Sequence, residues 1–269
     1  MTEKIQIAIP CGYNSEHYIN FLLDTIVKTV SDPERIEVLL GINKPNLDKD
    51  ILLKNKDVFN IKSIDAISPH NNSRGHGFCL DEMLKHMDSK YGMFVDCDVA
   101  FLEKNWDTKL IDLLVGDKVV IGAGTAKNHH HYYNFPFTIM SLFKVSPLKE
   151  VGISFMPKLV DLVLTEENAD IFGRNVGEKI HLDTAWEMPL KLKTNGYDGV
   201  ALKLVTPRDH SRDNIKFMTS DMRGEEQQLD GVPYFTHVGR SQSRPFNSPI
   251  VVKWRHRVDD WIRHKNEQS

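Results

Sequence analysis

The sequence predicts an α/β fold with a mainly parallel central sheet flanked by helices. In the first half of the chain, short apolar runs alternate with amphipathic stretches, which is the order expected of β-α-β units. With 269 residues, 41% of them hydrophobic and 26% charged, the chain can bury the core of one large domain. We therefore expect a single domain over 1–269, whose mixed second half elaborates the sheet.

The first strand and the helix after it have the clearest pattern. Residues 5–10 form an apolar run that breaks at Pro10-Cys11-Gly12, and Asn14 or Ser15 can cap a helix whose apolar residues recur at helical spacing. The same reasoning predicts further elements in order. They are strands at 36–42, 61–67 and 91–95, and helices at 47–57 and 74–87.

Regularity decreases in the second half. We expect a helix at 106–114, a strand at 118–123, an antiparallel strand at 137–145, and a helix at 183–194 that Pro189 kinks. Residues 206–231 are rich in Arg, Asp, Gly and Gln and predict a long mobile loop. A helix at 251–264 presents tryptophans on one face, which we expect to pack on the domain. The alternative for this basic helix is weak peripheral contact with anionic lipid.

Bulk properties exclude several classes of protein. A net charge of -3 and a pI near 6.5 give no basic field for nucleic acid. The three cysteines are odd in number and lack C-x-x-C spacing, so we expect reduced thiols and a cytoplasmic location. No apolar run reaches the roughly 18 to 20 residues that span a bilayer, and no signal peptide is evident.

Two carboxylates, Asp96 and Asp98, directly follow the buried run at 91–95. Residues two apart in a strand point to the same side, and two charges about 4 Å apart repel by roughly 4 kcal/mol at an effective dielectric near 20. A divalent cation would remove that penalty, and oxygen ligands suit Mg²⁺ or Mn²⁺. Open α/β sheets bind ligands at this end of their strands. The alternative is a pair of loop or capping aspartates.

Three segments carry a resemblance to a known family. The runs SRGHGFCLD at 73–81 and YGMFVDCDV at 91–99 resemble the centre of GT-A glycosyltransferases similar to glycosyltransferase family 2, and IAIPCGYN at 7–14 resembles their first strand and nucleotide-binding turn. Together they cover about the first 115 residues. Less specifically, 137–155 and 183–197 look like the acceptor half of that family. The resemblance implies a nucleotide-sugar-binding half at 1–125, an acceptor and catalytic half at 126–248, and a C-terminal helix at 249–269.

The resemblance also implies an activity and a metal. It implies an inverting transfer of a sugar from a nucleoside-diphosphate donor, carrying UDP or GDP, to a saccharide, glycoconjugate or other hydroxyl acceptor, as in polysaccharide biosynthesis. Asp98 would bind Mn²⁺ or Mg²⁺, with Asp96 on the donor or the metal, and His237 is the candidate third ligand. Asp183 would be the general base. Alternatively Asp183 caps a helix, and Glu187 competes for the same role.

Further residues are expected to hold the donor. The turn after the first strand would line the nucleotide base, and its members are Pro10, Gly12, Tyr13 and Asn14. Arg74, at a helix start, and Arg240 are candidates for the diphosphate. Asn43 stands where many relatives carry an acidic residue that reads base or ribose, which leaves the nucleotide open. The rival functions are a sugar-nucleotide nucleotidyltransferase, although 10–14 contains no Lys or Arg, and a non-catalytic saccharide-binding protein.

Overall fold

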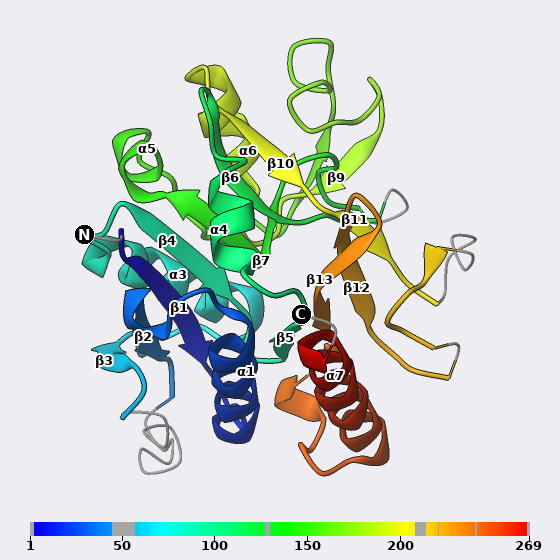
Figure 1. The fold of residues 1–269 in the computed structure, drawn as a ribbon. Helices are drawn as coiled ribbons and strands as arrows, with labels where there is room; N and C mark the ends of the chain where they lie inside the picture. The colour runs from blue at the N-terminus through cyan, green and yellow to red at the C-terminus, as the bar shows by residue number, and fades with distance from the viewer. Residues whose placement is uncertain are drawn as a thin grey trace.

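A seven-stranded sheet forms the centre of the molecule (Figure 1). The computed structural model describes residues 3–44, 57–126, 130–207, 214–219, 221–239 and 241–267. The strand order is β10-β6-β7-β4-β1-β2-β3, and every strand except β7 runs in the same direction. The predicted α/β fold with a mainly parallel sheet is therefore confirmed. The strands are β1 (Ile5–Cys11), β2 (Ile36–Ile42), β3 (Asn60–Asp65), β4 (Tyr91–Val95), β6 (Lys118–Ala123), β7 (Phe137–Lys144) and β10 (Asp198–Ala201).

Helices cover both faces of this sheet. Alternate residues of β1 divide between two cores, because neighbouring side chains on a strand point to opposite faces. Ile7 packs in the core that contains α1, α4 and α7, whereas Ala8 packs in the core that contains α3, α5 and α6. The helices are α1 (Glu16–Thr29), α3 (Asn72–His86), α4 (Trp106–Ile111), α5 (Val145–Glu150), α6 (Glu187–Thr194) and α7 (Pro249–Glu267), with short 3-10 turns η1 (Pro33–Arg35) and η3 (Ser241–Ser243).

A smaller antiparallel sheet begins where β4 ends. Its order is β11-β12-β13-β5, and β5 follows β4 after a tight turn. Its strands are β11 (Lys203–Val205), β12 (Glu225–Leu229), β13 (Val232–His237) and β5 (Val99–Phe101), while β8 (Asp161–Val163) and β9 (Lys179–His181) pair separately. The arrangement places the end of β13 beside the end of β4.

The long loop predicted over 206–231 is wrong, because β12 lies inside it. The strand reads Glu-Glu-Gln-Gln-Leu and has no apolar alternation, so it carries no strand signal in the sequence. Its polar side chains are nevertheless buried, since each has a partner. Glu226 accepts hydrogen bonds from the backbone N–H groups of 216–218, and Gln227 exchanges two hydrogen bonds with the backbone of Gly124.

Two other expectations also need correction. The helix predicted from residue 183 begins at Glu187, and residues 183–186 form turns before it. Pro189 does not kink this helix, since it lies in the first turn, where backbone N–H groups have no intrahelical partner. Residues 45–56 lie outside the described residues, so the helix predicted over 47–57 is not tested.

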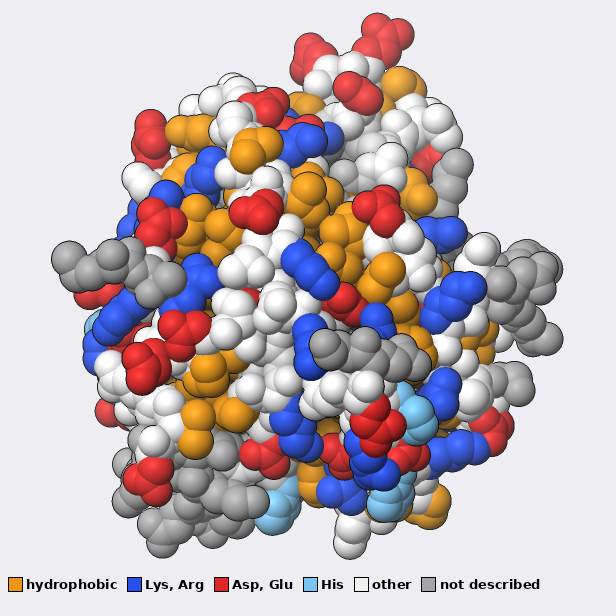
Figure 2. Space-filling view, in the orientation of Figure 1, with side chains coloured by type: hydrophobic (Ala, Val, Ile, Leu, Met, Phe, Trp, Pro, Cys, Tyr) orange, Lys and Arg blue, Asp and Glu red, His pale blue; other side chains and the backbone are white. Residues whose placement is uncertain are grey.

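The C-terminal helix packs on the domain rather than standing free. Trp254 is buried and its ring lies 5.3 Å from that of Phe21 on α1, and Figure 1 shows α7 running beside α1. None of the described helices combines the length and apolar character that crossing a bilayer requires. On the face shown in Figure 2, acidic and basic side chains of the described residues are interspersed.

We predict that Asp107→Ala destabilises the fold strongly. Asp107 is fully buried and accepts hydrogen bonds from the backbone N–H and hydroxyl of Ser31 and from Arg35, at 2.9, 2.5 and 2.9 Å. Removing the carboxylate leaves a buried guanidinium without its ion-pair partner, which costs about 3–5 kcal/mol. Urea unfolding measures the loss. Asp259→Ala breaks the exposed pair with Lys28 and should cost at most about 1 kcal/mol; equal effects for both variants would contradict the argument.

Candidate functional site

An open pocket of about 390 Å³ lies at the carboxyl ends of β1 and β4. The strand order 3-2-1-4 reverses between these two strands, and ligands of open α/β sheets bind at such a switch point. The pocket combines residues from the first strand, the start of α3, the turn after β4 and the end of β13. Its lining is Pro10, Gly12, Ser15, Asn72, Ser73, His76, Asp96, Cys97, Asp98, His237 and Ser241.

A tight turn, rather than an extended strand, brings the two carboxylates together. Strand β4 ends at Val95, and the N–H of Val99 donates to the carbonyl of Asp96 at 3.2 Å, which closes a four-residue turn. The expectation that strand geometry continues to Asp98 is therefore wrong. The convergence expected from it still occurs, because one ligand atom each from Asp96, Asp98 and His237 lie within 4.8 Å of one another.

Asp98 is buried and held by two backbone N–H groups. It is 3% exposed, its Oδ2 accepts from the N–H of Ser241 at 3.1 Å, and its backbone carbonyl accepts from the N–H of Val238 at 3.1 Å. Burial acts to raise the pKa of its carboxyl, but the adjoining His237 and the Ser241 N–H outweigh burial and lower the pKa below its usual value. A buried, ionised carboxylate with Oδ1 directed at the pocket is the result.

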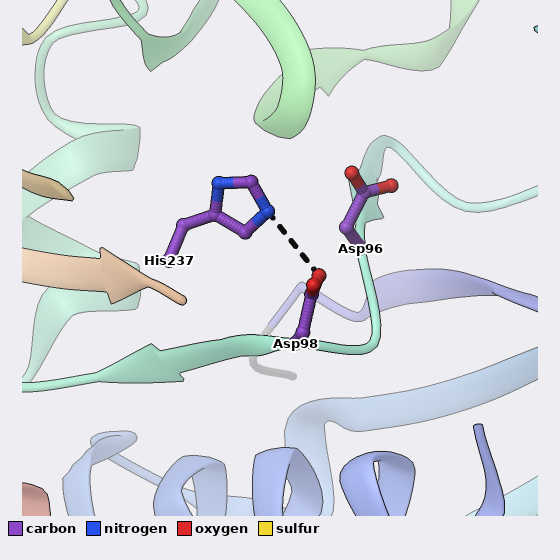
Figure 3. A group of neighbouring side chains, drawn as sticks. All are labelled: Asp96, Asp98 and His237. Atoms are coloured by element: carbon purple, nitrogen blue, oxygen red, sulfur yellow. Dashed lines mark ion pairs between the residues drawn. The ribbon is translucent and has the colours of Figure 1, made fainter. Parts of the chain in front are cut away.

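His237, the last residue of β13, lies between two carboxylates. Figure 3 shows its ring directing Nε2 toward Asp98, whose Oδ1 is 3.3 Å away, while Nδ1 is 3.2 Å from Oε1 of Glu225 on the neighbouring strand. Burial acts to lower the pKa of His237, but these two carboxylates raise it well above its usual value. The imidazole is therefore fixed at both nitrogens.

His76 on α3 contacts the other aspartate. Its Nε2 is 3.4 Å from Oδ1 of Asp96, which is within ion-pair distance, but this buried nitrogen has no hydrogen-bond partner among the described residues. Burial acts to lower the pKa of His76, but Asp96, Asp183 and Asp98 together raise it. Glycines on either side of His76 let α3 pack closely against neighbouring backbone. A Cβ on Gly75 would lie 2.7 Å from the carbonyl oxygen of His70, and one on Gly77 would lie 2.5 Å from that of Phe155.

The donor set fits a divalent cation. Asp96, Asp98 and His237 form the one group of three such side chains with converging ligand atoms within the described residues. Oδ2 of Asp98 and Nδ1 of His237 already have protein partners, which leaves Oδ1 and Nε2 to face each other across the site. Two carboxylates and one imidazole are ligands for Mn²⁺, and the carboxylates alone suit Mg²⁺.

The predicted donor-binding residues lie at different distances from this pocket. Pro10 and Gly12 line it, and Tyr13 and Asn14 are exposed between the lining residues Gly12 and Ser15. Tyr13 is 57% exposed, with Nζ of a lysine, Lys44, 5.0 Å from its ring centre. Ser15 occupies the cap position of α1, but its hydroxyl donates to the Gly12 carbonyl at 2.7 Å instead of capping the helix.

Two further predicted residues, Asn43 and Arg74, stand outside the lining. Asn43 accepts from the N–H of Ser68 and donates to the carbonyl of Gly75, both at 3.2 Å, so its amide joins two loops. Arg74 is exposed on α3. Arg240 lies outside the described residues.

Asp183 lies next to the pocket on the α3 side. Its Oδ1 accepts from the N–H of Thr184 at 2.8 Å, and the hydroxyl of Thr184 donates to the carbonyl of the lining residue Ser73 at 3.3 Å. In the described part of the chain no group hydrogen-bonds to Oδ2. Asp183 also does not cap α6, whose cap position is Trp186. The competing Glu187 is occupied, since its Oε2 accepts from the N–H of Ser154 at 3.1 Å and pairs with Lys191 at 2.6 Å.

Sequence reasoning missed His76 and Glu225. His76 stands inside the run 73–81, and helical spacing from Asn72 could have placed it toward the strand ends. Glu225 had no such signal, because only the pairing of β12 with β13 brings it opposite His237.

The fold has counterparts among solved structures. No family model and no curated protein matches the sequence. Mannosyltransferase PcManGT from Pyrobaculum calidifontis, solved with GDP-Man and Mn²⁺, is 11% identical with a TM-score of 0.52, covering 75% of this chain and 55% of that one. TarS from S. aureus is 19% identical with a TM-score of 0.45, covering 67% and 57%. This chain thus spans little more than half the length of these structures, and it has the GT-A fold of nucleotide-sugar glycosyltransferases.

Proposed function

We propose that this chain is a metal-dependent glycosyltransferase. It transfers a sugar from a nucleoside-diphosphate donor, carrying UDP or GDP, to a hydroxyl of a saccharide or glycoconjugate acceptor, with inversion at the anomeric carbon. The observation that carries the proposal is the convergence of Asp96, Asp98 and His237 in a pocket at the switch point of the sheet. The three buried, unpaired cysteines fit a reducing cytoplasm, where we place the reaction.

Each part of the pocket suits one part of such a donor. The turn at 10–14 would hold the nucleoside, with Tyr13 available to stack on the base. The first turn of α3 presents backbone N–H groups at Asn72 and Ser73, where a diphosphate would be stabilised by the helix dipole. Arg74 and Arg240 are candidates to add charge there. Asn43 would support this region indirectly, through its bonds to 68 and 75.

The chemistry then divides between two sides of the pocket. A bound Mn²⁺ or Mg²⁺ supplies Lewis acidity that stabilises charge on the departing diphosphate, and Asp96, Asp98 and His237 would hold it. Asp183 accepts the proton of the acceptor hydroxyl as the oxygen bonds to the anomeric carbon and the bond to the diphosphate breaks. Two observations support this role: Oδ2 of Asp183 has no hydrogen-bond partner among the described residues, and the adjacent Thr184 is bonded to Ser73.

A binding screen tests the proposal. UDP, GDP, their sugars and nucleoside triphosphates are each added with Mn²⁺, with Mg²⁺ or with EDTA, and thermal unfolding is followed. We expect one nucleoside-diphosphate sugar to raise the melting temperature only with metal, by an amount that grows with ligand concentration. A preference for triphosphates would instead support a sugar-nucleotide nucleotidyltransferase, and stabilisation by saccharides alone a binding protein without catalysis.

The product distinguishes the finer claims. With the best donor and a panel of saccharide acceptors, proton NMR reports whether the anomeric configuration of the transferred sugar is inverted. Retention of configuration would overturn the role given to Asp183, because a retaining transfer does not need a base on the acceptor side.

A further inference from the structure

Glu225 stands directly behind the histidine of the metal site. Strands β12 and β13 pair in antiparallel register with Glu225 opposite His237. Oε1 of Glu225 is 3.2 Å from Nδ1 of His237, and Nε2, across the ring, is 3.3 Å from Asp98. Figure 3 shows this Nε2 edge turned toward the carboxylates. A histidine that donates Nδ1–H to a carboxylate keeps the Nε2 lone pair for an ion.

We propose that Glu225 is the positioning residue that makes His237 a nitrogen ligand, so that the site prefers first-row transition ions such as Mn²⁺ to Mg²⁺. This inference rests on the proposed metal-dependent function. Mg²⁺ binds through oxygen and retains several waters, so a nitrogen ligand adds little to its affinity. Transition ions gain more from imidazole, and their affinity for such mixed sites rises from Mn²⁺ to Co²⁺. A carboxylate on the far nitrogen increases the basicity of the ring and fixes its orientation.

The surroundings of Glu225 fix the strand segment that carries it. Its backbone carbonyl accepts from the hydroxyl of Thr236 at 2.8 Å, and its side chain is 19% exposed. The next two residues anchor the strand, since Glu226 binds three backbone N–H groups of 216–218 and Gln227 is bonded to Gly124. Of Glu225, Glu226 and Gln227, Glu225 is therefore the residue whose carboxylate contacts His237.

Glu225 is a support for a ligand and not a fourth ligand. The converging group consists of Asp96, Asp98 and His237, and Glu225 contacts the ring nitrogen that faces away from Asp98. Reaching the ion would require it to pass the imidazole. Its effect should therefore appear only through His237, and in proportion to how strongly each ion depends on nitrogen.

Calorimetric titration with MnCl₂, CoCl₂ and MgCl₂ tests this dependence on the full chain. For Glu225→Ala we expect the Kd of Mn²⁺ to rise by about 10- to 100-fold, as is typical for loss of such an outer partner. The Kd of Co²⁺ should rise at least as much, and that of Mg²⁺ by less than about threefold, because Mg²⁺ relies on oxygen. Glu225→Gln, which keeps an acceptor but not the charge, should show an intermediate loss. Glu34→Gln removes one exposed charge just before β2, at the amino ends of the strands and so away from the pocket. It should leave the Kd of all three ions unchanged.

A spectroscopic measurement separates positioning from a general loss of structure. The electron spin-echo signal of bound Mn²⁺ should show nitrogen modulation in the natural chain, none in His237→Asn and less in Glu225→Ala, with thermal unfolding run on each variant. Equal losses for all three ions, or unchanged Mn²⁺ affinity and nitrogen modulation in Glu225→Ala, overturn the inference alone. If the natural chain binds none of these ions, the proposed function fails and the inference fails with it.

Discussion

Asp98→Asn should abolish metal-dependent donor binding and reduce sugar transfer by more than about 100-fold. A charge-stabilising metal contributes several kcal/mol to the transition state, and each 1.4 kcal/mol changes a rate by about tenfold. Among the three proposed ligands Asp98 has one oxygen already bonded, because the Ser241 N–H donates to Oδ2, which leaves Oδ1 for the ion. The asparagine has the same shape but no charge, so it should fold while failing to hold the ion. Calorimetry with Mn²⁺ and the preferred nucleotide sugar, together with a transfer assay, measures both effects.

A matched variant separates the site from the loss of charge. Asp112→Asn removes the same charge from an exposed position at the end of α4 and should leave binding and transfer unchanged. Thermal unfolding should place both variants close to the natural chain. Metal-dependent binding of the donor by Asp98→Asn at unchanged affinity would show that the carboxylate pair is structural, as the capping alternative holds.

The strands that form the pocket floor were predictable because their local apolar pattern agrees with their burial in the fold. Strands β1, β2 and β4 are apolar except for Gln6 and Glu37, as expected of strands buried on both faces, and the predicted bounds of β2 and β4 agree with the structure. The position of Asp96 at the end of such a run therefore followed from the sequence. The backbone path after Asp96 did not follow from the sequence, since a turn closed by Val99 replaces the expected extended strand.

The other wall of the pocket was not predictable from local pattern. Strand β12 buries Glu226 and Gln227, which are bonded to the backbone of 216–218 and of Gly124, and no periodicity in the sequence indicates this. The pairing of Glu225 with His237 depends on that strand. His237 itself was proposed from the family resemblance, whereas its support by Glu225 came only from the tertiary structure. The sequence thus identified candidate metal ligands, and the pairing of β12 with β13 identified Glu225 as the residue that holds His237.

Asp183→Asn should leave donor binding intact and lower kcat by about 10²- to 10⁴-fold, the range that general-base catalysis supplies. Asp183 does not belong to the converging metal group, so the affinity for metal and nucleotide sugar should stay within about twofold. Only the oxygen that receives the acceptor proton is changed, since an amide can still accept the Thr184 N–H. Calorimetry and steady-state kinetics with varied acceptor separate the two effects.

Glu187→Gln is the matched control for the base, because Glu187 lies one turn further on and was the competing carboxylate. Its Oε2 is bonded to the Ser154 N–H and to Lys191, neither of which lines the pocket, whereas Asp183 adjoins the lining residue Ser73 through Thr184. Losing the charge of Glu187 weakens its pair with Lys191, so stability should fall by at most about 1 kcal/mol and kcat should stay within severalfold. If Glu187→Gln loses transfer while Asp183→Asn keeps the natural rate, the base is Glu187, and the loop at 183–186 only shapes the pocket wall.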